Sequence, residues 1–325
     1  MNRVEEESLK TVKIFYFQRS MKSIFQYIRR YLSETDKRIL IPVSIFTAVL
    51  VFINYTMGLD TAIRKNNSFP VKLICWYAVF LVAFAIPYLL THLFKPFVYP
   101  GKKRFLFFLL IAPLIFAVKI SLDIPFYFSD NLNWNNYWEH IIYWPLLLLI
   151  VAVILFIFWK SFDNNQPFYG IKTTMIDWKP YLLMLLIMLP LIAAASTQPD
   201  FLSVYPKLNA IAGIENEPGL RWWHKLVFEF SYGTDFIGIE LFFRGFLVLA
   251  FIKWFGTEAI LPMACFYCTI HFGKPLGECI SSYFGGIILG VVVYHTQSII
   301  GGLIVHLGIA WMMELGGYIG NTFIK

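Results

Sequence analysis

Charged side chains inside an apolar stretch are the first feature of this sequence that could do chemistry. Glu240 and Arg244 lie four residues apart within the apolar stretch 236–251. This spacing puts both on one face of a helix, with the acid on the favourable N-terminal side. An ionisable group within a membrane helix is costly unless it is paired or faces a wet cavity. The pair therefore either fixes helix packing or belongs to a functional site.

Two histidines in other apolar stretches could complete such a site. His271 follows Tyr267 by four residues, and His306 lies deep in an apolar stretch of its own. A carboxylate can hold a water and take its proton, one imidazole can pass that proton on, and another can stabilise a developing oxyanion. These parts suit peptide hydrolysis without a covalent intermediate. The alternative for each histidine is a hydrogen-bonded packing residue.

A metal site is the alternative for the same side chains. Two histidines and a glutamate form a known catalytic zinc set. However, the sequence contains no His-Glu-x-x-His spacing. We expect no cofactor, and keep zinc near His271 and His306 as the alternative.

The composition defines the class of protein that must position these residues. Hydrophobic types make up 58% of the 325 residues and charged types 14%. Soluble domains have about 45–50% and 25% of these types, and a soluble monomer has too little interior to bury the excess. This excludes a disordered chain, a repeat solenoid and an ordinary soluble enzyme. The net charge of +7 then fits anionic lipid and membrane topology better than nucleic acid.

The sequence predicts an all-α membrane protein, a polytopic bundle of eight or nine transmembrane helices. Apolar stretches of spanning length set this count. They are 39–58, 72–94, 104–121, 140–159, 180–197, 235–255, 258–272, 278–296 and 298–321. We divide the chain into a basic arm (1–38), N-terminal transmembrane helices with a polar loop (39–224) and a core that carries the candidate site (225–325).

The orientation follows from the basic residues. Residues 1–38 contain nine Lys and Arg, whereas 123–139 contain none. The positive-inside rule therefore predicts a cytoplasmic N-terminus. Apolar residues recur every three or four positions in the arm, which predicts an amphipathic helix on the cytoplasmic membrane surface. The members of this stripe are Phe17, Met21, Ile24, Ile28 and Tyr31.

The order of these residues resembles the CPBP family of intramembrane proteases. This is the family of type II CAAX prenyl endopeptidases and Abi bacteriocin-immunity proteins. Its motifs are Glu-Glu-x-x-x-Arg, Phe-x-x-x-His, and His followed four residues later by Asn or a small residue. Glu240 with Arg244, His271 and His306 match these motifs in order. The resemblance covers about residues 225–315, and the stretch from His271 to Glu278 looks like that of bacterial members.

The resemblance implies a glutamate-type intramembrane endopeptidase that acts on a membrane-associated protein or peptide. By analogy Glu240 activates water, His271 assists, His306 stabilises the oxyanion and Arg244 keeps Glu240 ionised. It further implies a multi-pass protein, in a bacterial plasma membrane, whose partners are lipids and the substrate and include no nucleic acid.

Three departures from the family pattern leave alternatives open. Ile239 stands where the family has its first Glu, Tyr267 replaces Phe, and Ala310 stands where some members have Asn. Glu240 could take over as the base, or Asp235 could supply the carboxylate. In the third case the chain is a catalytically inactive member that acts as a membrane scaffold or bacteriocin-immunity-type protein.

Overall fold

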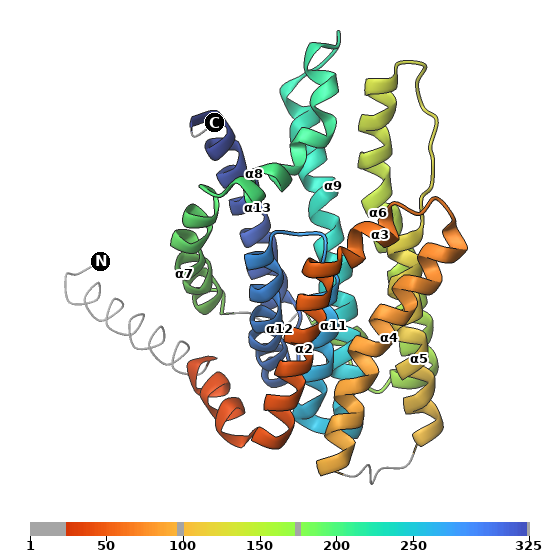
Figure 1. Cartoon of the computed structure of the whole chain (residues 1–325), viewed down its shortest axis with the longest axis vertical. Coiled ribbons are helices and arrows are strands. Elements are labelled where there is room, and N and C mark those ends of the chain that lie inside the picture. Colours follow the sequence, from red (N-terminus) through yellow and green to blue (C-terminus); the bar gives the residue numbers. More distant parts are fainter. Residues whose placement is uncertain (1–23, 96–100, 173–176, 324–325) are drawn as a thin grey trace, which may run out of the picture.

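The computed structural model describes residues 24–95, 101–172 and 177–323 (Figure 1). The regular secondary structure of these residues is helical, and no β-strand occurs among them. The α-helices are α2 (Lys37–Met57), α3 (Leu59–Arg64), α4 (Phe69–Phe94), α5 (Lys102–Ser121), α6 (Leu132–Phe158), α7 (Lys179–Ala195), α8 (Pro199–Val204), α9 (Trp222–Glu240), α10 (Ile252–Phe255), α11 (Ile260–Thr269), α12 (Leu276–Thr296) and α13 (Ile300–Phe323). The π-helical segments are η1 (Trp159–Asp163) and η4 (Leu241–Ala250). The 3₁₀-helical segments are η2 (Phe168–Gly170), η3 (Lys207–Asn216) and η5 (Gly256–Ala259).

Six helices within the described ranges are long and apolar enough to cross a membrane. They are α2, α4, α5, α6 extended by η1, α12 and α13. The chain is thus an integral, multi-pass membrane protein, but the predicted count of eight or nine is not confirmed. Three predicted spans differ from the helices found: α7 has 17 residues, α11 has 10, and the stretch 235–255 is divided among α9, η4 and α10.

The described part of the basic arm is a helix over residues 24–34. The stripe residues Ile24 and Tyr31 are buried against the bundle, and Tyr27 stacks on His295 with ring centroids 4.2 Å apart. Phe17 and Met21 lie outside the described residues. In this part of the arm, the apolar stripe packs on protein.

Local sequence signals set several helix ends. The side chain of Asp36 accepts a hydrogen bond from the backbone N–H of Arg38 and caps the start of α2. Gly58 ends α2 in the left-handed conformation at φ 65°, which glycine adopts without steric cost. Asn131 caps α6 by accepting from the backbone N–H groups of Asn133 and Trp134. Such caps satisfy backbone groups that a helix end leaves unpaired.

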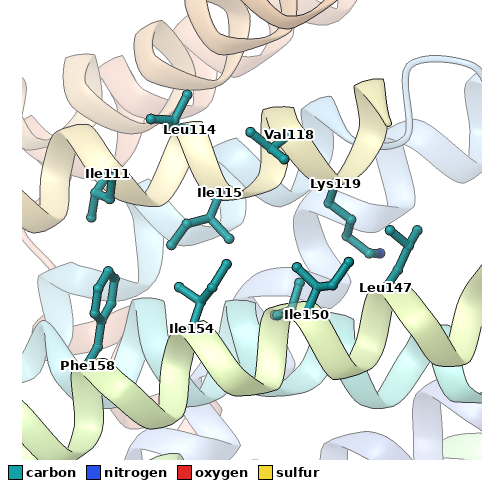
Figure 2. Close-up of a pocket in the computed structure, with 10 residues that line it drawn as sticks. Ile111, Leu114, Ile115, Val118, Lys119, Leu147, Ile150, Ile154 and Phe158 are labelled. Carbon is teal, nitrogen blue, oxygen red and sulfur yellow. The ribbon is translucent and has the colours of Figure 1, made fainter. Parts of the chain in front are cut away.

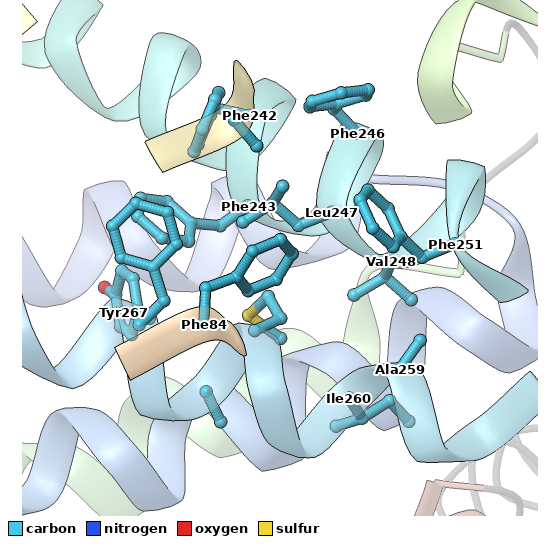
Figure 3. Packing of buried hydrophobic residues seen from close by; sticks show 14 of the residues in the cluster. Phe84, Phe242, Phe243, Phe246, Leu247, Val248, Phe251, Ala259, Ile260 and Tyr267 are labelled. Carbon is cyan, nitrogen blue, oxygen red and sulfur yellow. The ribbon is translucent and has the colours of Figure 1, made fainter. Parts of the chain in front are cut away.

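The main hydrophobic core joins the two halves of the chain. Phe84 of α4 and Phe243 of η4 belong to this core (Figure 3). Both pack against Phe266 of α11, with ring centroids 5.6 and 5.2 Å away. Phe116 of α5 contacts Phe243 at 5.0 Å. The first helices therefore hold η4 and α11, which carry Arg244 and Tyr267, in a rigid aromatic setting.

An apolar groove of about 210 Å³ lies between α5 and α6 (Figure 2). Aliphatic side chains and Phe158 line it, with Lys119 as its polar member. None of Glu240, His271 and His306 lines this groove. It is therefore separate from the site that the sequence predicts.

Candidate functional site

Glu240 is the last residue of α9, and the helix widens directly after it. Residues 241–250 form the π-helical segment η4, which contains Arg244. The sequence predicted a regular helix through this region. π-Helical turns are rare and often occur at functional sites, because they re-aim side chains that a regular helix would point elsewhere. Every residue from Gly238 to Phe251 is buried.

The carboxylate of Glu240 reaches across to α13. Its Oε1 atom lies 2.9 Å from Nδ1 of His306, and the side chains are 0% and 12% exposed. A carboxylate only accepts hydrogen bonds, so Nδ1 of His306 must carry the proton. Gly302 makes this approach possible, since a Cβ atom there would lie 2.7 Å from Oε2 of Glu240.

Arg244 supplies the charge that offsets Glu240. Its Nη1 atom is 3.2 Å from Oε1 of Glu240, and both side chains are 0% exposed. The two atoms are close enough for an ion pair but are not aligned as a hydrogen bond. No guanidinium nitrogen of Arg244 has a hydrogen-bond partner in the described part of the chain. The guanidinium also lies over the ring of Tyr267, 3.9 Å from its centroid. The predicted pair at positions 240 and 244 is thus formed, with an aromatic ring as a further partner.

Tyr267 of α11 connects the two histidines. Its hydroxyl oxygen is 3.0 Å from Nε2 of His306. Its backbone carbonyl accepts a hydrogen bond from Nδ1 of His271 at 2.9 Å, and the rings of Tyr267 and His271 are 4.7 Å apart. The carbonyl can only accept, so His271 is protonated at Nδ1 and carries its lone pair on Nε2. Glu240, Arg244, Tyr267, His271 and His306 therefore form one cluster from α9, η4, α11, the turn after it and α13.

The turn that carries His271 is tied to the end of α2. The Asn54 side chain donates to the carbonyl of Phe272 at 3.0 Å and accepts from the backbone N–H of Asp60 at 2.9 Å. Tyr55 donates from its hydroxyl to the carbonyl of Lys274. A Cβ at position 273 would lie 2.9 Å from Oδ2 of Asp60, so the turn passes close to α3. These contacts fix His271 relative to helices far away in the sequence.

The remaining sequence candidates lie elsewhere or are apolar. Asp235 forms an ion pair with Lys119, with Oδ1 and Nζ 2.6 Å apart. Its carboxylate is thereby committed to α5. Ile239 is buried in the main hydrophobic core, and Ala310 packs with Tyr232 and Phe236. Of the two candidate carboxylates, Glu240 is thus the one that contacts His306.

The arrangement does not fit a zinc ion. Both ring nitrogens of His306 have partners, Glu240 at Nδ1 and Tyr267 at Nε2. Catalytic zinc sites use three protein ligands. Among the described residues, no group of three or more His, Cys, Asp or Glu side chains could hold a metal.

Sequence reasoning missed three contributors to the cluster. Tyr267 looked like a mild replacement of Phe, and neither Asn54 nor Gly302 stood out. For Tyr267, the sequence did contain a signal: a tyrosine with a polar hydroxyl stands where the family motif has Phe. The contacts of Asn54 and Gly302 join distant segments, which no local pattern encodes.

The cluster lies inside a segment that matches a known family. Residues 222–312 match the family model described as type II CAAX prenyl endopeptidase Rce1-like. We call residues 222–312, which are similar to this family, the Rce1-like segment. The match confirms the resemblance drawn from the motifs and supports an intramembrane endopeptidase type at the level of the family. No curated protein and no solved structure matches the chain.

The Rce1-like segment begins at the first residue of α9 and ends within α13. It is under a third of the chain, yet it includes all five residues of the cluster. The helices before it contribute the aromatic packing and the ties to the His271 turn. The Rce1-like segment therefore supplies the polar groups, and the preceding helices hold them in place.

Proposed function

We propose that this protein is an intramembrane endopeptidase that hydrolyses a peptide bond of a membrane-associated protein or peptide. The observation that carries this proposal is the chain of contacts from Arg244 through Glu240, His306 and Tyr267 to His271. A carboxylate, an imidazole and a hydroxyl in that order form a known arrangement for acid–base chemistry.

In the proposed reaction, Glu240 and His306 act together as the base, which differs from the oxyanion role that the family resemblance implied for His306. Glu240 holds the proton of His306 on Nδ1, so that the lone pair of Nε2 faces the site. In the resting site the Tyr267 hydroxyl donates to this lone pair. A water that takes its place gives its proton to Nε2 as its oxygen attacks the scissile carbonyl carbon. The imidazolium that forms is stabilised by the carboxylate of Glu240. Arg244 keeps that carboxylate ionised inside the protein.

His271 acts on the other side of the water. Its Nδ1 proton is held by the carbonyl of Tyr267, so that Nε2 is an acceptor that can orient the water. The breaking C–N bond then needs a proton on its nitrogen. The protonated His306 supplies this proton, which returns the site to its starting state.

The substrate class follows from the family description and the setting. The matched family is named for CAAX prenyl endopeptidases, so we propose a peptide bond near a lipidated or hydrophobic C-terminal segment. Apolar outer faces of α2, α4 and α12 are consistent with a substrate that reaches the site from the membrane. We further propose a bacterial plasma membrane as the location, with the N-terminus in the cytoplasm. Partners are then membrane lipids and the substrate.

A second function is favoured by one specific observation. Ile239 is buried among apolar side chains, and Oε1 of Glu240 is already bound to His306. A site of this kind could bind a membrane segment without cleaving it. The protein would then act as a membrane scaffold or a bacteriocin-immunity-type protein, and the cluster would only stabilise the bundle.

Turnover in proteoliposomes separates the two functions. The probes are a quenched fluorescent peptide with a farnesylated C-terminal CAAX sequence and the same peptide without the farnesyl group. We expect cleavage by the wild type and a loss of at least about 100-fold in Glu240→Gln and His271→Ala. His295→Ala is the control, since His295 stacks on Tyr27 away from the cluster. Equal rates in all four proteins, or no cleavage by any, would overturn hydrolysis and favour the scaffold.

A further inference from the structure

Tyr267 is placed where a reacting carbonyl would need a hydrogen-bond donor. Its hydroxyl lies 3.0 Å from Nε2 of His306. Its ring contacts that of His271, with centroids 4.7 Å apart. The side chain is 4% exposed, so its hydroxyl acts in surroundings of low polarity. Hydrogen bonds to developing charge are stronger there than in water.

This hydrogen bond depends on the protonation state of His306. Before reaction, Nε2 of His306 has a lone pair, so the Tyr267 hydroxyl must donate to it. Nε2 has a single lone pair, so the Tyr267 hydroxyl turns away from it as this nitrogen takes a proton from water. The single hydroxyl proton of Tyr267 is then released from His306. It becomes free at the moment when negative charge develops on the carbonyl oxygen.

We propose that Tyr267 donates the hydrogen bond that stabilises this oxyanion, a role that rests on the proposed hydrolysis. In the step, the water oxygen forms a bond to the carbonyl carbon and the C=O π electrons move onto the oxygen. The proton of the water goes to Nε2 of His306. The Tyr267 hydroxyl then donates to the negatively charged oxygen and keeps its own proton, and no redox change occurs.

Arg244 strengthens this donor without touching the substrate. Its guanidinium lies 3.9 Å from the centroid of the Tyr267 ring and is 0% exposed. A cation over the ring draws electron density from it, which makes the O–H group a better hydrogen-bond donor. Because Arg244 itself is fully enclosed, its effect reaches the oxyanion through the tyrosine.

The variant Tyr267→Phe tests this role, because it removes the hydroxyl and keeps the ring over Arg244. We expect kcat to fall about 10²–10³-fold, the loss typical of one oxyanion donor. KM should stay close to the wild-type value, because the charge exists only in the transition state. Tyr283→Phe is the matched control, since it removes a buried hydroxyl that bonds Ser44 of α2 at 3.0 Å.

A second measurement detects the oxyanion contact without turnover. A peptide phosphinate carries a charged oxygen in the tetrahedral geometry of the intermediate. The affinity for this phosphinate should fall in Tyr267→Phe by a factor similar to the fall in kcat. Affinity for the uncleaved peptide is measured in the Glu240→Gln variant, with and without Tyr267→Phe. It should be the same in both proteins. Thermal unfolding in detergent checks that all variants are folded.

The outcomes distinguish the two proposals. An active wild type with unchanged kcat and phosphinate affinity in Tyr267→Phe overturns the role of Tyr267 and leaves hydrolysis intact. A rise in KM alone, or a loss equal to that in Tyr283→Phe, assigns the hydroxyl to packing and also overturns the role. No cleavage by the wild type overturns hydrolysis, and the oxyanion role with it.

Discussion

Oε1 of Glu240 and Nδ1 of His306 lie 2.9 Å apart, although 66 positions separate the two residues in the sequence. The contact joins the end of α9 to the N-terminal third of α13. It sets the tautomer of His306 and satisfies one oxygen of a fully enclosed carboxylate.

The coupling between these two residues is measurable. In a double-mutant cycle of Glu240→Ala and His306→Ala, we expect a coupling free energy of about 1.5–3 kcal/mol, because the hydrogen bond involves a charged group. The measurement is unfolding in detergent. The exposed pair of Lys225 and Glu215, 2.9 Å apart, is the control and should couple by about 1 kcal/mol or less. Equal coupling in both pairs would contradict the prediction.

Replacing Arg244 should lower the free energy of unfolding far more than replacing Arg64, which lies in a more exposed ion pair. Arg244→Met leaves the Glu240 carboxylate without an opposite charge, and we expect a loss of about 3–5 kcal/mol. Adding Glu240→Gln should recover much of that loss, since the unpaired charge is then gone. Arg64→Met is the control, because Arg64 forms a similar i,i+4 pair with Asp60 while 48% exposed. A comparable loss in both single variants would show that the enclosed pair has no special role.

Gly302 should tolerate no side chain. In Gly302→Ala the new Cβ would lie 2.7 Å from Oε2 of Glu240, which must then move away from His306. We expect a destabilisation of about 1–3 kcal/mol from overpacking and a loss of activity in the cleavage assay. Gly285→Ala in α12 is the control, since a Cβ there meets nothing within 4 Å. Wild-type behaviour of Gly302→Ala would mean that Glu240 does not lie against α13.

The turn that carries His271 should loosen without Asn54. Asn54→Leu keeps the size of the side chain but leaves the carbonyl of Phe272 and the N–H of Asp60 unpaired, at a cost of about 1–3 kcal/mol each. Amide hydrogen exchange over residues 270–275 should become faster, and kcat should fall. Asn136→Ala serves for comparison, because Asn136 bonds the carbonyl of Ala210 at an exposed place. Unchanged exchange in the turn would refute this role of Asn54.

Lys207 should make stability depend on pH. Burial, and next the positive charge of Lys274, lower the pKa of Lys207 from 10.5 to about 8. The folded state therefore binds this proton less tightly than the unfolded chain does. The free energy of unfolding should rise with pH from about 8 to 10.5. In Lys207→Met that rise should be smaller than in the wild type when unfolding is followed in detergent at pH 7 and pH 10, and parallel pH profiles would contradict it.

Local properties of the chain were enough to predict the membrane class and the candidate residues. The composition required lipid around the bundle, and most long apolar stretches became helices close to their predicted bounds. The spacing of Glu240 and Arg244 predicted their pairing. Helix periodicity carries these properties, because they depend on neighbours within a few turns.

The contacts between distant segments were decided by the tertiary structure alone. The sequence offered Glu240 and Asp235 as alternative carboxylates. Only packing placed Lys119 beside Asp235 and left Glu240 to His306. It likewise turned the hydroxyl of Tyr267 toward His306 and widened the helix after Glu240. A buried charge takes whichever partner the packed helices bring within reach, and that depends on helix rotation and crossing rather than on spacing along one helix.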